Sequence, residues 1–235
     1  MTARIRSISA FLITAGVLLL LASHSPAFGK KGLKISVGDD PSLKEGEGSP
    51  ELVLVEISDF QCTYCIYSAK EVIPQVYEWL VRRGKVEIVF LDMPLQGPTS
   101  LKAARAAACA GDQNRFWDMH DRLFENAKAL SPDQFPKHAE ALGLDVAAFQ
   151  KCLSSGKHDG GIRDDMRVAR TMLGITGTPA YVIGRRVPGS KDKVEVLETI
   201  RGALPYGDLE LKLSAFLTPE APAVPEAPSQ PDPKN

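Results

Sequence analysis

The chain has 235 residues, of which 44% are hydrophobic and 24% charged, and its 28 basic and 29 acidic side chains give a formal net charge of −1. This near-neutral balance excludes the strongly basic surface of a nucleic-acid-binding protein. The length fits one domain with terminal extensions.

The first 27 residues have the three-part pattern of a secretory signal peptide. Arg4 and Arg6 precede an uncharged stretch of 15 mostly apolar residues from Ile8 to Ala22, and small residues follow at the expected cleavage point. The alternative is an uncleaved membrane anchor, but a spanning helix needs about 20 apolar residues. We therefore expect cleavage at residue 27 and a periplasmic or other extracytoplasmic location, where disulfides persist.

Between the two ends we expect one domain at residues 51–217. Residues 28–50 are expected to form a connection with one short strand near 33–37. The last stretch, 218–235, holds six of the 17 prolines and little that could form a core. It predicts a disordered, proline-rich tail.

The start of the domain predicts a strand, a helix and a second strand. The segment ELVLVEIS, 51–58, is apolar on both faces for much of its length, as in the central strand of a sheet. An apolar stripe at helical spacing then runs from Cys65 to Leu80, and Pro74 is expected to bend that helix. A further strand follows at 86–91. The right-handed crossover of such a unit makes its two strands parallel.

Residues 99–173 predict helices almost throughout, inserted into this α/β pattern. Ser131 and Pro132 are expected at the N-cap and first position of one helix, and Gly143 and Gly156 at helix ends. The expected helices are 99–110, 115–127, 131–142, 145–153 and 161–173. After this insertion we expect two strands and a last amphipathic helix, at 180–184, 194–201 and 209–217.

The segment FQCTYC places Cys62 and Cys65 three positions apart at the beginning of the first helix. A c-type haem would need histidine directly after the second cysteine, where this chain has Ile66. Structural zinc would need two more ligands, but Cys109 and Cys152 are far apart in the sequence and neither has a nearby Cys or His arranged as a second half-site. We therefore expect no metal and no cofactor.

Redox chemistry fits this pair of cysteines better. A thiolate at a helix N-terminus is stabilised by unpaired backbone N–H groups and by the helix dipole, which lowers its pKa. Cys62 is therefore the expected attacking thiol, and Cys65 the thiol that resolves a mixed disulfide. Asp59 and Glu56 are candidates for a buried proton acceptor serving Cys65.

Several stretches together resemble the DsbA-like thiol-disulfide oxidoreductases of the thioredoxin-like superfamily. These are SDFQCTYC (58–65), FLDMPL (90–95), FWDMHDRLF (116–124), LGLDVAAFQKCL (142–153) and GITGTPAYVIGRRVPG (174–189), with the bend at Pro74. The resemblance implies an α/β, thioredoxin-like fold with a helical insertion between the βαβ unit and the cis-proline strand.

The resemblance also implies roles for single residues. Pro179 would be the cis-proline facing the active-site pair, and the backbone of Thr178 would pair with a substrate strand. A substrate cysteine would form a mixed disulfide with Cys62, and a membrane or soluble partner would reoxidise the protein. Thr63 and Tyr64 are expected to tune the potential, since the histidine found between the cysteines of the best-known oxidases is missing here.

We therefore expect an exported thiol-disulfide oxidoreductase that donates disulfides to substrate proteins with cysteine thiols. The alternatives are a disulfide reductase of the same fold and a redox-idle module that binds peptides as a chaperone does. A monomer is expected, since residues 28–50 are too few for the N-terminal dimerisation domain of related isomerases. Cys109 and Cys152 are expected to form a structural disulfide, the alternative being two buried free thiols.

Overall fold

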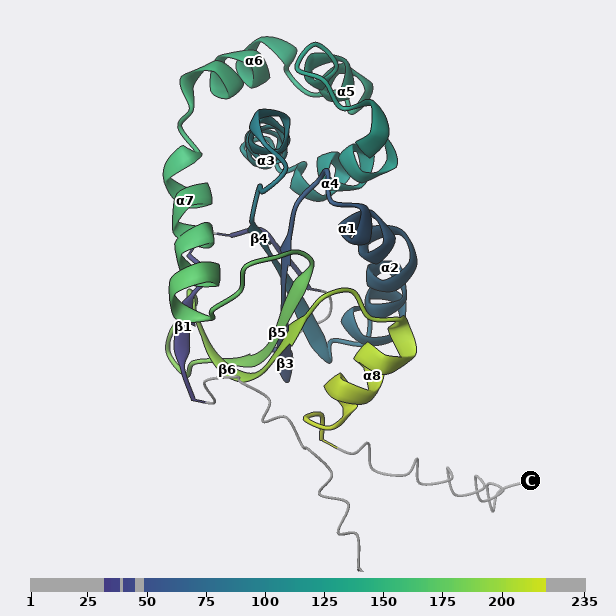
Figure 1. The fold of residues 1–235 in the computed structure, drawn as a ribbon, viewed down its shortest axis with the longest axis vertical. Coiled ribbons are helices and arrows are strands. Elements are labelled where there is room, and N and C mark those ends of the chain that lie inside the picture. The colour runs from purple at the N-terminus through teal and green to yellow at the C-terminus, as the bar shows by residue number, and fades with distance from the viewer. Residues whose placement is uncertain (1–31, 39, 45–48, 219–235) are drawn as a thin grey trace, which may run out of the picture.

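The computed structural model in Figure 1 describes residues 32–38, 40–44 and 49–218. The expected signal peptide at 1–27 and the expected tail, apart from Thr218, lie outside the described residues. In the part that is described, none of the helices has the length and apolar character needed to span a membrane.

A six-stranded mixed sheet forms the centre of the domain. Its strands lie in the order β1-β6-β5-β3-β4-β2, with β3 parallel to β4 and every other neighbouring pair antiparallel. Their bounds are Lys34–Ser36 (β1), Ser42–Leu43 (β2), Leu52–Ser58 (β3), Val86–Asp92 (β4), Ala180–Arg186 (β5) and Lys193–Arg201 (β6). All seven residues of β3 are buried, as expected of a central strand. The short edge strand β2 was not predicted, because two residues are too few to give a periodic pattern.

The first helical stretch follows β3 directly and packs on one face of the sheet. It consists of α1 (Thr63–Tyr67) and α2 (Ile73–Val76), with π-helical turns at Ser68–Val72 and Tyr77–Val81. The first π-helical turn lies just before Pro74, whose ring nitrogen has no hydrogen to donate to the helix. The helix is therefore irregular next to Pro74, the residue at which a bend was predicted.

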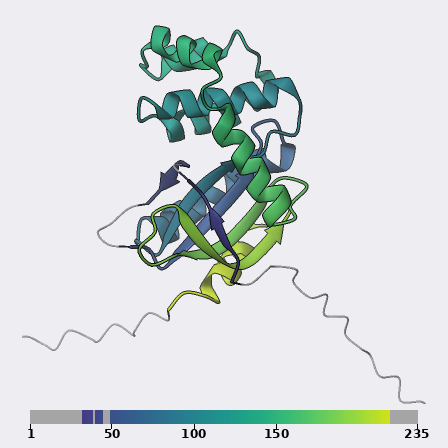
Figure 2. The ribbon, with the colours of Figure 1, turned by 90° about the vertical axis from the view of Figure 1, so that its left-hand side faces the viewer.

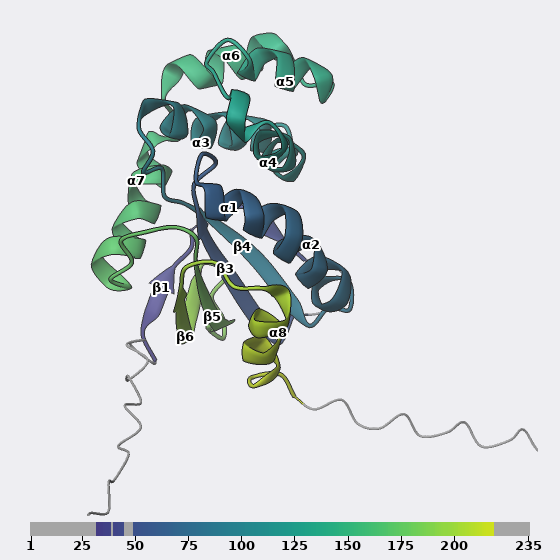
Figure 3. The ribbon, with the colours of Figure 1, turned by 45° about the vertical axis from the view of Figure 1, so that its right-hand side comes forward.

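Two layers of helices cover the sheet, and a third group lies beyond the ends of its strands. Figure 3 shows α1, α2 and α8 (Tyr206–Ser214) against one face, where the apolar side chains of α2 and α8 share a core with Leu52 and Leu54 of β3. The opposite face is covered by α7 (Asp159–Arg167) and the π-helical turn Val168–Met172. Figure 2 shows α7, in green, running from the insertion down across the sheet.

The predicted helical insertion lies between β4 and β5. Its other helices are α3 (Pro98–Gly111), α4 (Phe116–Glu125), α5 (Phe135–Ala141) and α6 (Val146–Ser155), with one 3₁₀ turn at Ala127–Ala129. They enclose a separate apolar core that also takes in Phe60, Cys62 and Cys65. The active-site candidates therefore lie where the sheet and the insertion meet.

Helix α5 begins later than predicted. Ser131 does not cap it, because its hydroxyl donates to the carboxylate of Asp133, and residues 131–134 form a turn. Gln134 is the N-cap, and Pro136 takes the early helical position that was assigned to Pro132. Two proline-containing starts close together in the sequence are hard to separate, since each satisfies the same rule. By contrast, Asp145 caps α6 through the Ala148 N–H, at 2.9 Å.

Candidate active site

Cys62 is the N-cap residue of α1, as the sequence predicted. Its backbone is extended (φ −75°, ψ 123°), and its carbonyl accepts the first helical hydrogen bond, from Ile66 N at 2.9 Å. The thiol therefore lies where the unpaired N–H groups of the first turn point. Cys62 is 7% exposed, whereas Cys65, one turn further on, is fully buried.

The loop before Cys62 is held by the buried carboxylate of Asp59. One oxygen accepts from the N–H of Gln61 at 2.9 Å and from the hydroxyl of Ser100. The other oxygen accepts from the N–H groups of Leu95 and Gln96, at 2.6 and 3.0 Å. Asp59 thus ties the active-site loop to the loop after β4 and to the start of α3. Because both of its oxygens are engaged in these bonds, it fits an anchor better than the proton acceptor considered from the sequence.

The peptide bond between Thr178 and Pro179 is cis, and it faces Cys62. The Cys62 thiol donates a hydrogen bond to the Thr178 carbonyl oxygen at 3.3 Å, although the two residues are 116 positions apart. The pKa of Cys62 is lowered to about 6. The main cause is a hydrogen bond from the Cys65 thiol, with further contributions from the Thr178 side chain and the backbone N–H groups of Cys65 and Tyr64. Cys62 is thus the member of the pair that is a thiolate at neutral pH.

Cys65 has the opposite electrostatic environment. Burial raises its pKa strongly, because a thiolate there would lose its hydration, and the hydrogen bond to Cys62 raises it further. Ser58, at the end of β3, lowers this pKa through its hydroxyl group. Both Cys62 and Cys65 are free thiols in the structure. The surroundings therefore favour the charged thiolate at Cys62 and the protonated thiol at Cys65.

Glu56 carries a buried carboxyl group and lies on the same face of β3 as Ser58. Its Oε1 accepts from the Ser68 hydroxyl at 3.2 Å, and Ser68 in turn accepts from the Tyr181 hydroxyl at 2.7 Å. Burial raises the pKa of Glu56 to about 7, partly opposed by Ser68 and Ser58. The hydroxyl of Ser58 lowers the pKa of both Glu56 and Cys65 and is thus near both groups, although Ser58 Oγ and Glu56 Oε2 are buried without a hydrogen-bond partner. This arrangement can store a proton near Cys65 at neutral pH.

The two residues between the cysteines face outward. Thr63 is exposed, and Tyr64 is 67% exposed, one of the most exposed large side chains of the described residues. Beside them lies a groove of about 410 Å³ whose lining includes Thr63, Tyr67, Lys70 and, from the insertion, Lys128. The surface next to Cys62 is therefore open and carries aromatic and basic groups.

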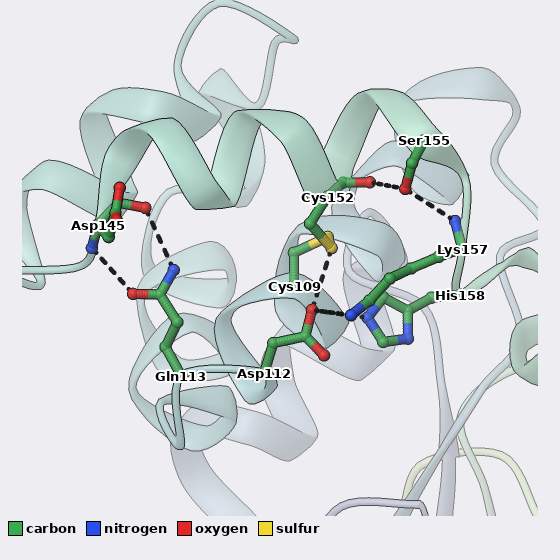
Figure 4. A network of polar contacts seen from close by, with 8 residues as sticks. All are labelled: Cys109, Asp112, Gln113, Asp145, Cys152, Ser155, Lys157 and His158. Carbon is green, nitrogen blue, oxygen red and sulfur yellow. Dashed lines mark hydrogen bonds and ion pairs between the residues drawn. A yellow bond between two sulfur atoms is a disulfide. The ribbon is translucent and has the colours of Figure 1, made fainter.

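The second pair of cysteines forms a disulfide. Cys109 of α3 and Cys152 of α6 are bonded, with 5.8 Å between their Cα atoms, across 43 positions of sequence. This is the pairing expected from the sequence. Figure 4 shows what the sequence did not indicate, that Asp112 and His158 lie against this disulfide. His158 had no recognisable signal, because its six-residue distance from Cys152 crosses a helix end at Gly156.

A thioredoxin-like domain with a cis-proline opposite a CxxC pair is the class that this fold and site define. The model of the thioredoxin family matches residues 41–201, and the chain belongs to this family. Among curated relatives, the Na(+)/H(+) antiporter NhaA 3 of Salinispora tropica is 33% identical over 160 residues, 67% of this chain and 24% of the antiporter. A probable disulfide bond formation protein D of Bacillus anthracis is 28% identical, over 59% of this chain and 68% of that protein. The chain thus spans about a quarter of the length of the antiporters it matches.

Solved structures show the same fold. Oxidised BdbD from Bacillus subtilis superposes with a TM-score of 0.67, at 18% identity, over 80% of this chain and 97% of BdbD. α-DsbA1 from Wolbachia pipientis superposes with a TM-score of 0.64, at 21% identity, over 76% of this chain and 90% of α-DsbA1. The predicted α/β, thioredoxin-like fold with a helical insertion is confirmed, and its likeness is to DsbA-type proteins.

Proposed function

We propose that this protein is an exported thiol-disulfide oxidoreductase that donates disulfides to substrate proteins through Cys62 and Cys65. The observation that carries the proposal is the lowered pKa of Cys62, about 6, at a helix N-terminus and opposite the cis Thr178–Pro179 bond. A stabilised thiolate favours the reduced dithiol, which makes the Cys62–Cys65 disulfide the better oxidant.

The reaction moves two electrons from the substrate to the pair. A substrate thiolate attacks Cys62 Sγ, the Cys62–Cys65 bond breaks, and Cys65 leaves with the electron pair. Since the pKa of Cys65 is strongly raised, its sulfur takes up a proton at once. Glu56, which lies nearby and has a pKa of about 7, is the proposed source of that proton. A second substrate thiolate then attacks the substrate sulfur of the mixed disulfide, and Cys62 leaves as a stable thiolate.

The substrate is proposed to be an extended cysteine-containing segment. The backbone at Thr178 would pair with it beside Cys62, and the adjoining groove at Thr63 and Tyr67 would hold its neighbouring side chains. Thr63 and Tyr64 would adjust the redox potential, since they flank the thiolate and face the substrate.

The proposed location is extracytoplasmic, based on the signal-like pattern at 1–27. A periplasmic thioredoxin-like protein from Salmonella enterica has the same fold, with a TM-score of 0.53. The pair is proposed to be reoxidised by a separate redox partner, either a membrane protein or a soluble one.

The test is oxidation of a peptide with two thiols by the purified protein. Cys62→Ser and Cys65→Ser should each reduce the rate to the uncatalysed background, because neither variant can carry the Cys62–Cys65 disulfide that accepts the two electrons. The matched control is Cys109→Ala/Cys152→Ala, which should retain the reaction. Chaperone activity that survives Cys62→Ser, with no dithiol oxidation by the wild type, would instead support the redox-idle module. A reduction potential near thioredoxin's, about −270 mV, would favour the reductase.

A further inference from the structure

Four potential metal ligands meet at the disulfide of the insertion. One ligand atom each from Cys109, Asp112, Cys152 and His158 lies within 4.8 Å of the other three. They come from α3 and its C-cap, from α6, and from the N-cap of α7. Figure 4 shows the Asp112 carboxylate lying against the disulfide, with Lys157 and His158 beside it. The set comprises two sulfurs, one imidazole nitrogen and one carboxylate oxygen, which is a zinc-type set.

We propose that Cys109, Asp112, Cys152 and His158 form a zinc site when the disulfide is reduced, so that this pair exchanges a covalent bond for a metal. A tetrahedral zinc ion at bond lengths of about 2.0 to 2.3 Å places its ligand atoms about 3.3 to 3.8 Å apart. Asp112 Oδ2 is already 3.2 Å from Cys152 Sγ and 3.2 Å from His158 Nε2. The two bonded sulfurs need to separate, and the remaining ligand atoms, all within 4.8 Å of one another, need to move only slightly.

The conversion balances in two steps. An external dithiol passes two electrons and two protons to the disulfide, so that the bond between Cys109 and Cys152 breaks, two thiols form, and the dithiol becomes a disulfide. A zinc ion then displaces both thiol protons and binds the two thiolates. The contact between Cys152 Sγ and Asp112 Oδ2 is not a hydrogen bond while the disulfide is intact, since that sulfur has no proton. Its 3.2 Å length places the two atoms close enough to bind one metal ion after reduction.

The segments that carry the ligands are held together by contacts other than the disulfide. Gln113, next to Asp112, makes two hydrogen bonds with the backbone of Asp145 at the start of α6, at 2.9 and 3.2 Å. Arg105 of α3 pairs with Asp159 of α7 through two bonds of 2.6 Å. These bonds hold α3, α6 and α7 in place when the disulfide opens, so the reduced protein retains an assembled site.

A metal ion can reach the cluster through a cavity, and the side chain of Lys157 contacts one of the proposed ligands. Asp112 and His158 line a cavity of about 780 Å³ between the insertion and the sheet. The Lys157 ammonium lies 2.7 Å from Asp112 Oδ2, but its side chain is 52% exposed and can turn away. Lys157 therefore competes with zinc for the same oxygen.

The experiment uses the full chain with Cys62→Ser/Cys65→Ser, which removes the other dithiol as a zinc ligand and makes the result independent of the proposed oxidoreductase activity. After reduction with a phosphine, the protein is titrated with zinc against a chromophoric chelator. Cobalt absorption spectra in place of zinc report tetrahedral thiolate ligation. We expect one zinc ion per reduced chain and none per oxidised chain.

Variants separate this site from unspecific binding. His158→Ala and Asp112→Asn should each weaken zinc binding by at least about tenfold, as loss of a ligand should cost no less than loss of an outer-sphere partner. Lys157→Ala should strengthen it. The control is Asp164→Asn, an exposed partner of Arg167 on α7, which should leave it unchanged. The proposal is overturned if the reduced chain binds no zinc, whether it is folded or unfolded by circular dichroism. It is equally overturned if neither His158→Ala nor Asp112→Asn changes the affinity.

Discussion

Two cysteine pairs in this domain each lie beside a carboxyl group. The two carboxyl groups differ in their burial and in the direction in which their pKa is shifted. Glu56 is fully buried next to the Cys62–Cys65 pair, and burial raises its pKa to about 7. Asp112, beside Cys109–Cys152, is one-third exposed. Its slight burial would raise its pKa, but Lys157 and His158 outweigh that effect and lower it.

The difference teaches how one residue type supports two chemistries. Although the Thr178 carbonyl oxygen also contacts Cys62, the Cys65 thiol, the Thr178 side chain and backbone N–H groups are donors that stabilise its thiolate. Cys152 instead faces a carboxylate oxygen at 3.2 Å. A disulfide beside donors is readily reduced, whereas one beside an ionised carboxylate gains no such stabilisation of its thiolate.

The largest expected effect concerns stability. Cys109→Ala/Cys152→Ala should lower the free energy of unfolding by about 4 kcal/mol in the chain-entropy model, because the disulfide closes a loop across 43 positions of sequence. Urea unfolding of the oxidised proteins, with a metal chelator present, measures it. The comparison variant is Cys62→Ala/Cys65→Ala, whose two-residue loop gives a much smaller entropic effect. Equal losses in the two variants would contradict the assignment of a structural role to one pair alone.

The second effect distinguishes the two carboxyl groups by their pH dependence. The pKa of Glu56 rises from 4.5 to about 7 on folding. Below pH 4.5 the group is protonated in both states. Between pH 4.5 and 7 the unfolded chain ionises first, so stability falls as the pH rises, by about 3 kcal/mol in all. Glu56→Gln removes this loss. The free energy of unfolding of the variant, relative to that of the wild type, should therefore be higher at pH 8 than at pH 4.

Asp112→Asn provides the control, with the opposite sign. The pKa of Asp112 is lowered on folding, so this carboxylate contributes stability above its unfolded pKa that is lost as the pH falls. The variant should be less stable than the wild type at pH 8 and nearly equal to it at low pH. Both measurements use oxidised protein, in which Cys62 does not titrate. A Glu56→Gln variant with the same pH profile as the wild type would show that the carboxyl is ionised in the folded state.

The sequence predicted the elements of the site better than their contacts. A buried strand followed by FQCTYC sufficed to place Cys62 at the helix N-terminus, since that inference needs only local patterns. Glu56 and Asp59 looked equivalent as candidate acceptors. They differ because the period of two along β3 turns Glu56 toward Ser68 and Tyr181, whereas Asp59 lies past the strand and meets Leu95 and Gln96.

The cluster at the second disulfide shows the limit of reasoning from spacing. Spacing along the sequence does not single out Asp112 and His158 as neighbours of Cys109 and Cys152. They are brought together by the docking of α3, α6 and α7, which long-range contacts such as Arg105 to Asp159 determine. Such contacts have no periodic signature in a single sequence.

The smallest effect tests which donor lowers the pKa of Cys62. The Cys65 thiol is the main cause, so Cys65→Ala should raise the midpoint of Cys62 alkylation from about 6 by at least one unit, equivalent to about 1.4 kcal/mol. Cys65→Ser is the matched variant, because its hydroxyl can still donate, and its midpoint should stay near that of the reduced wild type. Rates of reaction with iodoacetamide across pH measure both, since only the thiolate reacts. If both variants titrate like the wild type, the helix N-terminus and Thr178 suffice to stabilise the thiolate. In that case the position of Cys62 at a helix N-terminus, opposite Thr178, distinguishes the two cysteine pairs. The side-chain donors and acceptors around the sulfurs then contribute less to the difference in thiolate stability.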